Sequence, residues 1–160
     1  MADYIRFDWA MKRLLRDKAN YGVIEGLLTT LLNEKITIRR MLESESNQEE
    51  EYDKSNRVDI LAEDSKGRLI LFEIQNNNEY AYFQRMLFGV SKLVTEYIRR
   101  GQGYENIRKI YSINIVYFAL GAGKDIVYHG TTEFRGIHNN DILQLSPFQR
   151  EKFEVDTVSQ

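Results

Sequence analysis

The sequence contains no cysteine and a single proline, and it has no long hydrophobic run. Without cysteine, neither a disulfide framework nor a thiolate zinc site can form. No apolar run approaches the roughly 20 residues that a membrane-spanning helix requires, and the first four residues, MADY, do not begin an apolar signal segment. The sequence therefore predicts a cytoplasmic protein that does not enter a membrane.

Excess charge of one sign is also lacking. The formal net charge is −2 at pH 7, which argues against a protein that coats nucleic acid by charge alone. Acidic residues gather between Glu43 and Asp53, a run that fits a solvated loop better than an acidic partner-binding segment. The chain has 160 residues, of which 42% are hydrophobic and 29% charged, as expected for one globular domain with a buried core.

The hydrophobic pattern predicts both helices and strands. Helices are expected at 8–18, 21–34 and 79–100, and the inner side of the last would carry Phe83, Leu87, Val90, Val94 and Tyr97. Strands are expected at 35–42, 56–64, 68–75, 107–118 and 125–134. This order predicts a mixed α/β or α+β domain over residues 1–148, followed by a polar tail at 149–160.

The most informative segment is a predicted hairpin. The connection Ser65-Lys66-Gly67 lies between the strands at 56–64 and 68–75 and is a turn signal. It sets Asp64 opposite Arg68, and counting outward from that pair gives every other pair. Three apolar pairs then share one face: Val58 with Ile74, Ile60 with Phe72, and Ala62 with Ile70. A slip of one residue would scramble both faces, so the hydrophobic pattern supports this register.

The same register places Asp59 directly opposite Glu73 on the other face, beside the apolar pair Leu61 and Leu71. Directly opposed residues have Cβ atoms about 4.5–5.5 Å apart, and like charges there are destabilising. A hard divalent cation that takes one oxygen from each carboxylate would offset the repulsion, activate a water and stabilise charge on a phosphate. An exposed hairpin face, or a pair neutralised by Arg57, explains the spacing equally well.

Three segments carry a resemblance to a known family. The run RVDILAEDSKGRLILFEIQ at 57–75 resembles the Rpn family of recombination-promoting nucleases, also described as PD-(D/E)XK family transposases. Upstream, FDWAMKRLL at 7–15 resembles the family's N-terminal helix, with Asp8 and Lys12 in an Asp-x-x-x-Lys pattern. Downstream, YFQRMLFGVSKLVTEYI at 82–98 resembles its arginine-bearing helix, and the strand KIYSINIVYF follows. The resemblance covers about residues 4–138 in the expected order.

The resemblance implies a restriction-endonuclease-like αβββαβ core with a central mixed sheet flanked by helices. It also implies cleavage of DNA phosphodiester bonds with magnesium, for which manganese is expected to substitute. By position, Asp59 is the metal-binding aspartate, and Glu73 is the acidic residue of the (D/E)-x-K element. Gln75 stands where most of the superfamily has lysine, a departure shared by the Rpn-like branch. It removes the usual cation beside the attacking water.

Four other residues are secondary candidates for the site. Glu25 could supply an outer carboxylate, although it also fits a solvated helix position. Arg85 and Lys92 are seven residues apart and project from one face of the predicted long helix, where they would contact DNA phosphates or serve as plain surface charges. Lys12 could replace the missing motif lysine.

Two functions are compatible with the sequence. The first is a magnesium-dependent DNA endonuclease tied to recombination or transposition, with Asp59, Glu73 and Gln75 as its catalytic residues. The second is a nuclease fold with weak or lost activity that binds DNA or protein. The two opposed carboxylates favour the enzyme, whereas Gln75 and the modest charge favour the binding module. Cutting both DNA strands with one active site per domain favours a homodimer.

Overall fold

A six-stranded mixed sheet forms the centre of the protein. The computed structural model describes residues 17–42, 57–75, 78–98, 101–153 and 156–159, with the backbone alone at 57–59, 151–153 and 156–159. The strands are β1 (Ile38–Leu42), β2 (Arg57–Asp64), β3 (Leu69–Gln75), β4 (Ile110–Val116), β5 (Tyr128–Gly130) and β6 (Asp156–Ser159). They lie side by side in the order β1-β2-β3-β4-β6-β5. The β3/β4 and β4/β6 pairs are parallel and the other pairs are antiparallel.

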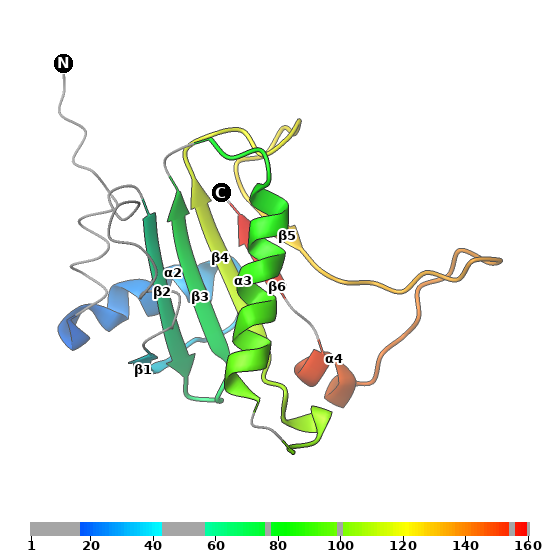
Figure 1. Ribbon diagram of the computed structural model, residues 1–160, viewed down its shortest axis with the longest axis horizontal. Coiled ribbons are helices and arrows are strands. Elements are labelled where there is room, and N and C mark those ends of the chain that lie inside the picture. Colours follow the sequence, from blue (N-terminus) through cyan, green and yellow to red (C-terminus); the bar gives the residue numbers. More distant parts are fainter. Residues whose placement is uncertain (1–16, 43–56, 76–77, 99–100, 154–155, 160) are drawn as a thin grey trace.

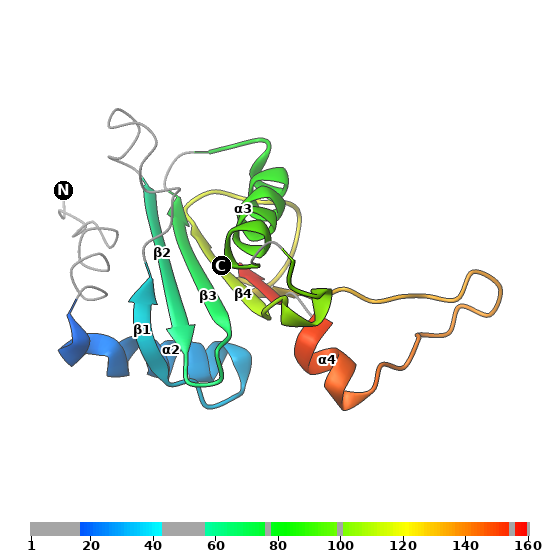
Figure 2. The ribbon, with the colours of Figure 1, turned by 60° about the horizontal axis from the view of Figure 1, so that its bottom comes forward.

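Two long helices cover opposite faces of this sheet (Figures 1 and 2). They are α2 (Tyr21–Leu32) and α3 (Tyr82–Tyr97), and a shorter helix, α4 (Pro147–Phe153), precedes β6. Single 3-10 turns occur at Lys18–Asn20 and Tyr104–Asn106. The order α2, β1, β2, β3, α3, β4 confirms the predicted αβββαβ core and the α/β fold class. No helix in the described ranges is long and apolar enough to cross a membrane.

The hairpin register matches the prediction at every position. The backbone pairs Val58 with Ile74, Asp59 with Glu73 and Leu61 with Leu71. A tight turn closes it, because Gly67 adopts a φ of 78°, a conformation that costs glycine little. The N–H of residue 67 donates to the carbonyl of Asp64 at 3.0 Å. The turn and the alternating pattern thus specify the same pairing.

Side chains from the two faces of the sheet form two separate cores. On the α2 side, the buried core includes Ile24, Leu28, Ala62, Ile70, Phe72 and Ile74. On the α3 side, the buried core consists of Leu61, Leu69, Leu71, Val90, Leu93 and Ile110. Alternation along β3 therefore directs odd-numbered side chains from Leu69 to Gln75 toward α3. The candidate residues of the hairpin lie on this second face.

The inner face of α3 differs from the prediction. Its buried residues are Tyr82, Met86, Val90 and Leu93, whereas Phe83 and Leu87 are 59% and 69% exposed. Apolar residues occupy more than one face of this helix, so hydrophobic periodicity alone does not identify the face that meets the sheet.

The segment expected to be a polar tail contributes to the sheet instead. Residues 147–153 form α4, and β6 inserts between β4 and β5 through parallel pairing with β4. The strand expected at 125–134 is reduced to three residues, Tyr128–Gly130. Four residues such as Asp156–Ser159 do not form a stable strand on their own. Backbone pairing with β4, which is distant in sequence, stabilises β6.

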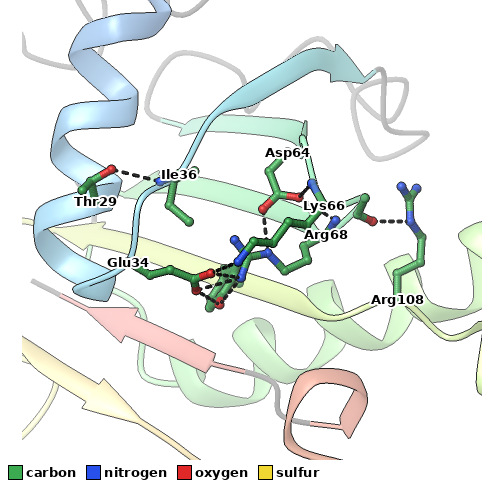
Figure 3. A network of polar contacts seen from close by, with 9 residues as sticks. Thr29, Glu34, Ile36, Asp64, Lys66, Arg68 and Arg108 are labelled. Carbon is green, nitrogen blue, oxygen red and sulfur yellow. Dashed lines mark hydrogen bonds and ion pairs between the residues drawn. The ribbon is translucent and has the colours of Figure 1, made fainter. Parts of the chain in front are cut away.

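A cluster of charged groups surrounds the turn of the hairpin (Figure 3). Arg68, whose side chain is 10% exposed, donates from Nε to Asp64 Oδ2 at 2.6 Å. Its Nη1 donates to Glu34 Oε2 at 2.8 Å and to the Tyr111 hydroxyl at 3.1 Å. Lys66 also pairs with Glu34. The cluster joins the loop after α2 to the hairpin and to β4.

A second buried carboxylate, Glu63, binds three arginines at the same end of the sheet. Arg108 lies 2.6 Å away, Arg40 3.1 Å and Arg39 3.4 Å. A β-bulge between Ile38 and Arg40 allows the two consecutive arginines to reach one carboxylate. Burial opposes ionisation of Glu63, but the hydrogen bonds from Arg108 and Arg40 outweigh it and lower its pKa.

The Glu34 carboxyl can be used to test how much the cluster around Arg68 contributes to stability. Burial disfavours its charged form, but hydrogen bonds from Arg68 and Lys66 prevail and lower its pKa from 4.5 to about 2. A depressed folded-state pKa stabilises the protein above the unfolded-state value and loses that effect as the pH falls. We expect wild type to exceed Glu34→Gln in free energy of unfolding above about pH 5. That advantage should shrink between pH 4.5 and 2.

Urea unfolding of both proteins at several pH values from 7 to 2.5 would measure this difference. Glu133→Gln is the matched control, because Glu133 is an exposed carboxylate that pairs with the nearby Arg135 and exposed pairs contribute little. A pH-independent difference between wild type and Glu34→Gln would contradict the expectation.

Candidate active site

Polar residues of three adjacent strands are neighbours in the register of the sheet. Asp59 of β2 pairs with Glu73 of β3, and Glu73 is the partner of Asn114 in β4. Glu73 and Asn114 are 6% and 1% exposed, respectively. The position of Asp59 is given by its backbone pairing. The core of the sheet is thus interrupted by polar groups near the end of β3.

Arg85 of α3 binds the central carboxylate of this row. Its Nε donates to Glu73 Oε1, and its Nη1 donates to Glu79 Oε2 at 3.0 Å. The Arg85 side chain is 15% exposed and that of Glu73 only 8%. Removing one member of an ion pair so shielded from water is costly, because the charge that remains loses a buried partner. Arg85 therefore fixes the orientation of Glu73.

Two buried atoms near this ion pair have no hydrogen-bond partner within the described part of the chain. One is Oε1 of Gln75, an acceptor, and the other is Nη2 of Arg85, a donor. Gln75 is itself 6% exposed and follows Glu73 by two residues on the same side of β3. A buried polar group left unpaired costs about 1–3 kcal/mol. The site thus offers one acceptor and one donor to a ligand or to water.

A chain of hydrogen bonds extends the site across β4. The Tyr82 hydroxyl donates to Asn114 Oδ1 at 3.1 Å, and Asn114 Nδ2 donates to Ser112 Oγ at 2.9 Å. The rings of Tyr82 and Phe118 meet edge to face, with their centroids 5.5 Å apart. Sequence reasoning missed these residues. The sequence pattern that could have indicated them is the alternation of serine and asparagine with apolar residues along Ile110–Val116.

The secondary candidates occupy different places. Glu25 accepts a hydrogen bond from the N–H of Ile38 at 2.6 Å, and Ile38 pairs with Asp64 at the turn end of β2. This end lies five residues from Asp59, or roughly 16 Å along the strand. The structure therefore does not bring Glu25 to the opposed pair.

Of the basic candidates, only Arg85 contacts Glu73 within the described residues. Lys92 is half-buried on the same helix, about 10 Å farther along its axis. Lys12, proposed as a replacement for the motif lysine, lies outside the described residues.

The donor chemistry of the site is that of oxygen ligands. It comprises carboxylates at Asp59 and Glu73 and amide oxygens at Gln75 and Asn114. Such groups suit hard divalent cations such as magnesium. Among the described side chains, which do not include that of Asp59, no group of three His, Cys, Asp or Glu is placed to hold a metal. The pair from the hairpin and the amide of Gln75 are therefore the groups to test.

This fold and this hairpin define the chain as a protein of the PD-(D/E)XK nuclease class. The model of the family described as PD-(D/E)XK nuclease family transposase matches residues 5–144, and the chain belongs to that family. The match confirms the resemblance seen in the sequence and includes Asp59, Glu73, Gln75 and Arg85. It supports a function of the nuclease or transposase type. Neither a curated protein nor a solved structure matches the chain.

The buried pair of Glu73 and Arg85 leads to a stability prediction. Arg85→Met should remove the arginine partner of the buried Glu73 and destabilise the metal-free protein by about 3–5 kcal/mol. The double variant Arg85→Met/Glu73→Met should recover much of this loss, because neither charge remains. Urea unfolding of wild type, both single variants and the double variant would give the coupling energy. Additive effects would show that the two side chains do not depend on each other.

Proposed function

We propose that the protein is a divalent-metal-dependent DNA endonuclease with Asp59 and Glu73 as metal ligands. The observation that carries this proposal is the pairing of Asp59 with the buried Glu73 on the central hairpin of a PD-(D/E)XK fold. A carboxylate on the residue opposite a buried carboxylate is destabilising unless cations offset the two charges. Arg85 supplies one positive charge to this site, and a magnesium ion held by both carboxylates would add to it. Manganese is expected to substitute.

The residues present fit a hard cation. The available ligands are oxygens, and Gln75 Oε1 is a buried acceptor with no partner among the described residues. Asp59 and Glu73 would hold the ion, and Gln75 lies close enough in the strand to face the same space. When bound, magnesium would lower the pKa of a water and neutralise part of the charge on the scissile phosphate.

Three other side chains, those of Gln75, Arg85 and Lys92, would position the attacking water and the DNA phosphates. The Gln75 amide both donates and accepts hydrogen bonds, so it can orient the attacking water without supplying charge. Arg85 has a buried N–H group at Nη2 that is without a partner in the described residues, and we assign it to an oxygen of the scissile phosphate. It would thereby provide the positive charge that lysine supplies in most of the superfamily. Lys92, farther along α3, would contact a neighbouring phosphate.

A second candidate function is a nuclease fold that binds DNA or protein without cutting. One observation favours it: Arg85 forms an ion pair with Glu73, so the carboxylate has a cationic partner within the chain. Under this alternative the carboxylate serves to position the arginine for a phosphate. The two functions differ in whether a divalent cation binds the folded protein, and the next prediction separates them.

Metal binding should be visible in thermal stability. A ligand that binds only the folded state stabilises it by mass action, by about 2.7 kcal/mol at 100 times its Kd. Magnesium or manganese should therefore raise the Tm of wild type, and Asp59→Asn should abolish the increase. Glu133→Gln, on an exposed segment, should respond as wild type does. An equal response of Asp59→Asn and wild type would argue that the pair is not a metal site.

Cleavage of plasmid DNA tests the catalytic roles. At saturating magnesium, Glu73→Ala should lose nearly all activity, because a metal ligand is removed. Gln75→Ala should lose about 10²–10⁴-fold, as is typical of a positioned catalytic group. Gln75→Lys restores the common superfamily motif and should retain or increase activity. EDTA should abolish cleavage by every variant.

One outcome of the same assay would contradict the proposed endonuclease activity. If purified Glu73→Ala cuts DNA as fast as wild type, the activity is a contaminant or lies elsewhere. The binding module would then be the better description, and DNA affinity rather than cleavage should respond to Arg85.

A further inference from the structure

A preformed hairpin extends from the body of the protein in both views (orange in Figures 1 and 2). We call residues 133–143 the arm. Its backbone is held by hydrogen bonds from Leu143 N to Phe134 O at 2.9 Å and from Gly136 N to Asp141 O at 2.8 Å. A bridge pairs Arg135 with Ile142. The arm is therefore an ordered element rather than an unstructured loop.

The arm carries apolar side chains that do not pack into either of the two cores. Ile137 at its tip is 94% exposed, and Phe134, Ile142 and Leu143 are also exposed. A two-stranded hairpin alone in water is marginally stable at best, and it needs packing against another surface to persist. Its composition thus indicates that another surface covers it.

An open apolar groove lies between α3 and the segment that leads into the arm. It has a volume of about 860 Å³. One wall is the exposed side of α3, with Phe83 and Leu87, and the other includes Phe118, Ile126 and Tyr128. Ile126 is 75% exposed. Contiguous apolar surface of this kind marks an interaction site in soluble proteins.

The arm and the groove match in chemistry and in size. Both present mainly apolar side chains, and the segment 116–132, most of which lines one wall, leads directly into the arm. The arm runs away from its own α3 rather than over it (Figures 1 and 2). In a reciprocal exchange, each copy would contribute both its arm, residues 133–143, and the exposed walls of its groove. Stable interfaces take about 20–30 residues from each partner.

We propose that the arm of one copy occupies the groove of a second copy, and the reverse, in a two-fold dimer. Because the same two surfaces are used on both copies, the exchange closes on itself and does not propagate into a filament. Ile137 acts as the anchor that enters beside Leu87. The contact itself requires neither DNA nor metal, so it can be tested independently of the nuclease proposal. For a DNA endonuclease, the exchange would join two active sites, one for each strand.

Cross-linking provides a direct test, because the chain has no cysteine of its own. Ile137→Cys and Leu87→Cys are prepared separately, mixed and treated with a flexible bismaleimide. The mixture should give a covalent dimer, and neither variant alone should give one in comparable yield. The matched control replaces Leu87→Cys by Val23→Cys, which is 60% exposed on α2 at the opposite face of the sheet.

Sedimentation of the metal-free protein measures the oligomeric state. Wild type should dimerise, and Ile137→Asp or Leu87→Asp should each weaken the dimer by roughly 30-fold or more, as expected for loss of an interface anchor. Val23→Asp should leave it unchanged. An equimolar mixture of the two aspartate variants should recover part of the dimer, because one intact arm and one intact groove remain.

Several outcomes would overturn the exchange. Monomeric wild type at tens of micromolar would do so, as would a dimer that Ile137→Asp and Leu87→Asp do not affect. So would a cross-link confined to single chains of the double variant Ile137→Cys/Leu87→Cys, because the arm would then cover its own groove. None of these results bears on metal binding or DNA cleavage, so failure here leaves the proposed activity open to its own tests.

Discussion

The register of the β2–β3 hairpin is the constraint on which the rest of the molecule depends. It is set twice, by the turn at Gly67 and by the apolar alternation that divides the two cores. With this pairing, Glu73 faces α3, where Arg85 can reach it. A slip of one residue would move Glu73 to the α2 side and bring its apolar neighbours out of both cores. Stability and the geometry of the candidate site are therefore specified by the same interaction.

Buried polar and charged groups have different sets of partners at the two ends of this hairpin. At the turn, Glu63 has three arginine partners and Glu34 has both Arg68 and Lys66, so the carboxylates there are fully compensated. At the other end, Arg85 binds the buried Glu73, and Gln75 Oε1 and Arg85 Nη2 have no hydrogen-bond partner among the described residues. Natural sequences leave polar groups unsatisfied mainly where a ligand completes them. The unpaired atoms support the proposal that the end of β3 is the functional site.

The hairpin and the order of the elements could be predicted from the sequence, because they depend on short segments of the chain. The alternation in β2 and β3 and a three-residue turn determine the pairing of Asp59 with Glu73, and the family resemblance gave the order of the elements. The partner of Glu73 could not be predicted, because it depends on how α3 rotates over the sheet. That rotation buries Tyr82 and Met86 and exposes Phe83 and Leu87, although all four are apolar. Asn114 was missed because its place beside Glu73 arises from parallel pairing between β3 and β4.

The position of β6 has a consequence for how the protein is made. This strand follows all the others in sequence, yet it lies inside the sheet, and β5 pairs only with it in the described sheet. During synthesis at about 5–20 residues per second, β1 to β4 emerge first and present the open side of β4 to solvent. An unpaired strand edge is a template for aggregation. The ribosome must release residues 156–159 before this edge is covered, so a nascent chain arrested after β4 would be the species most in need of a chaperone.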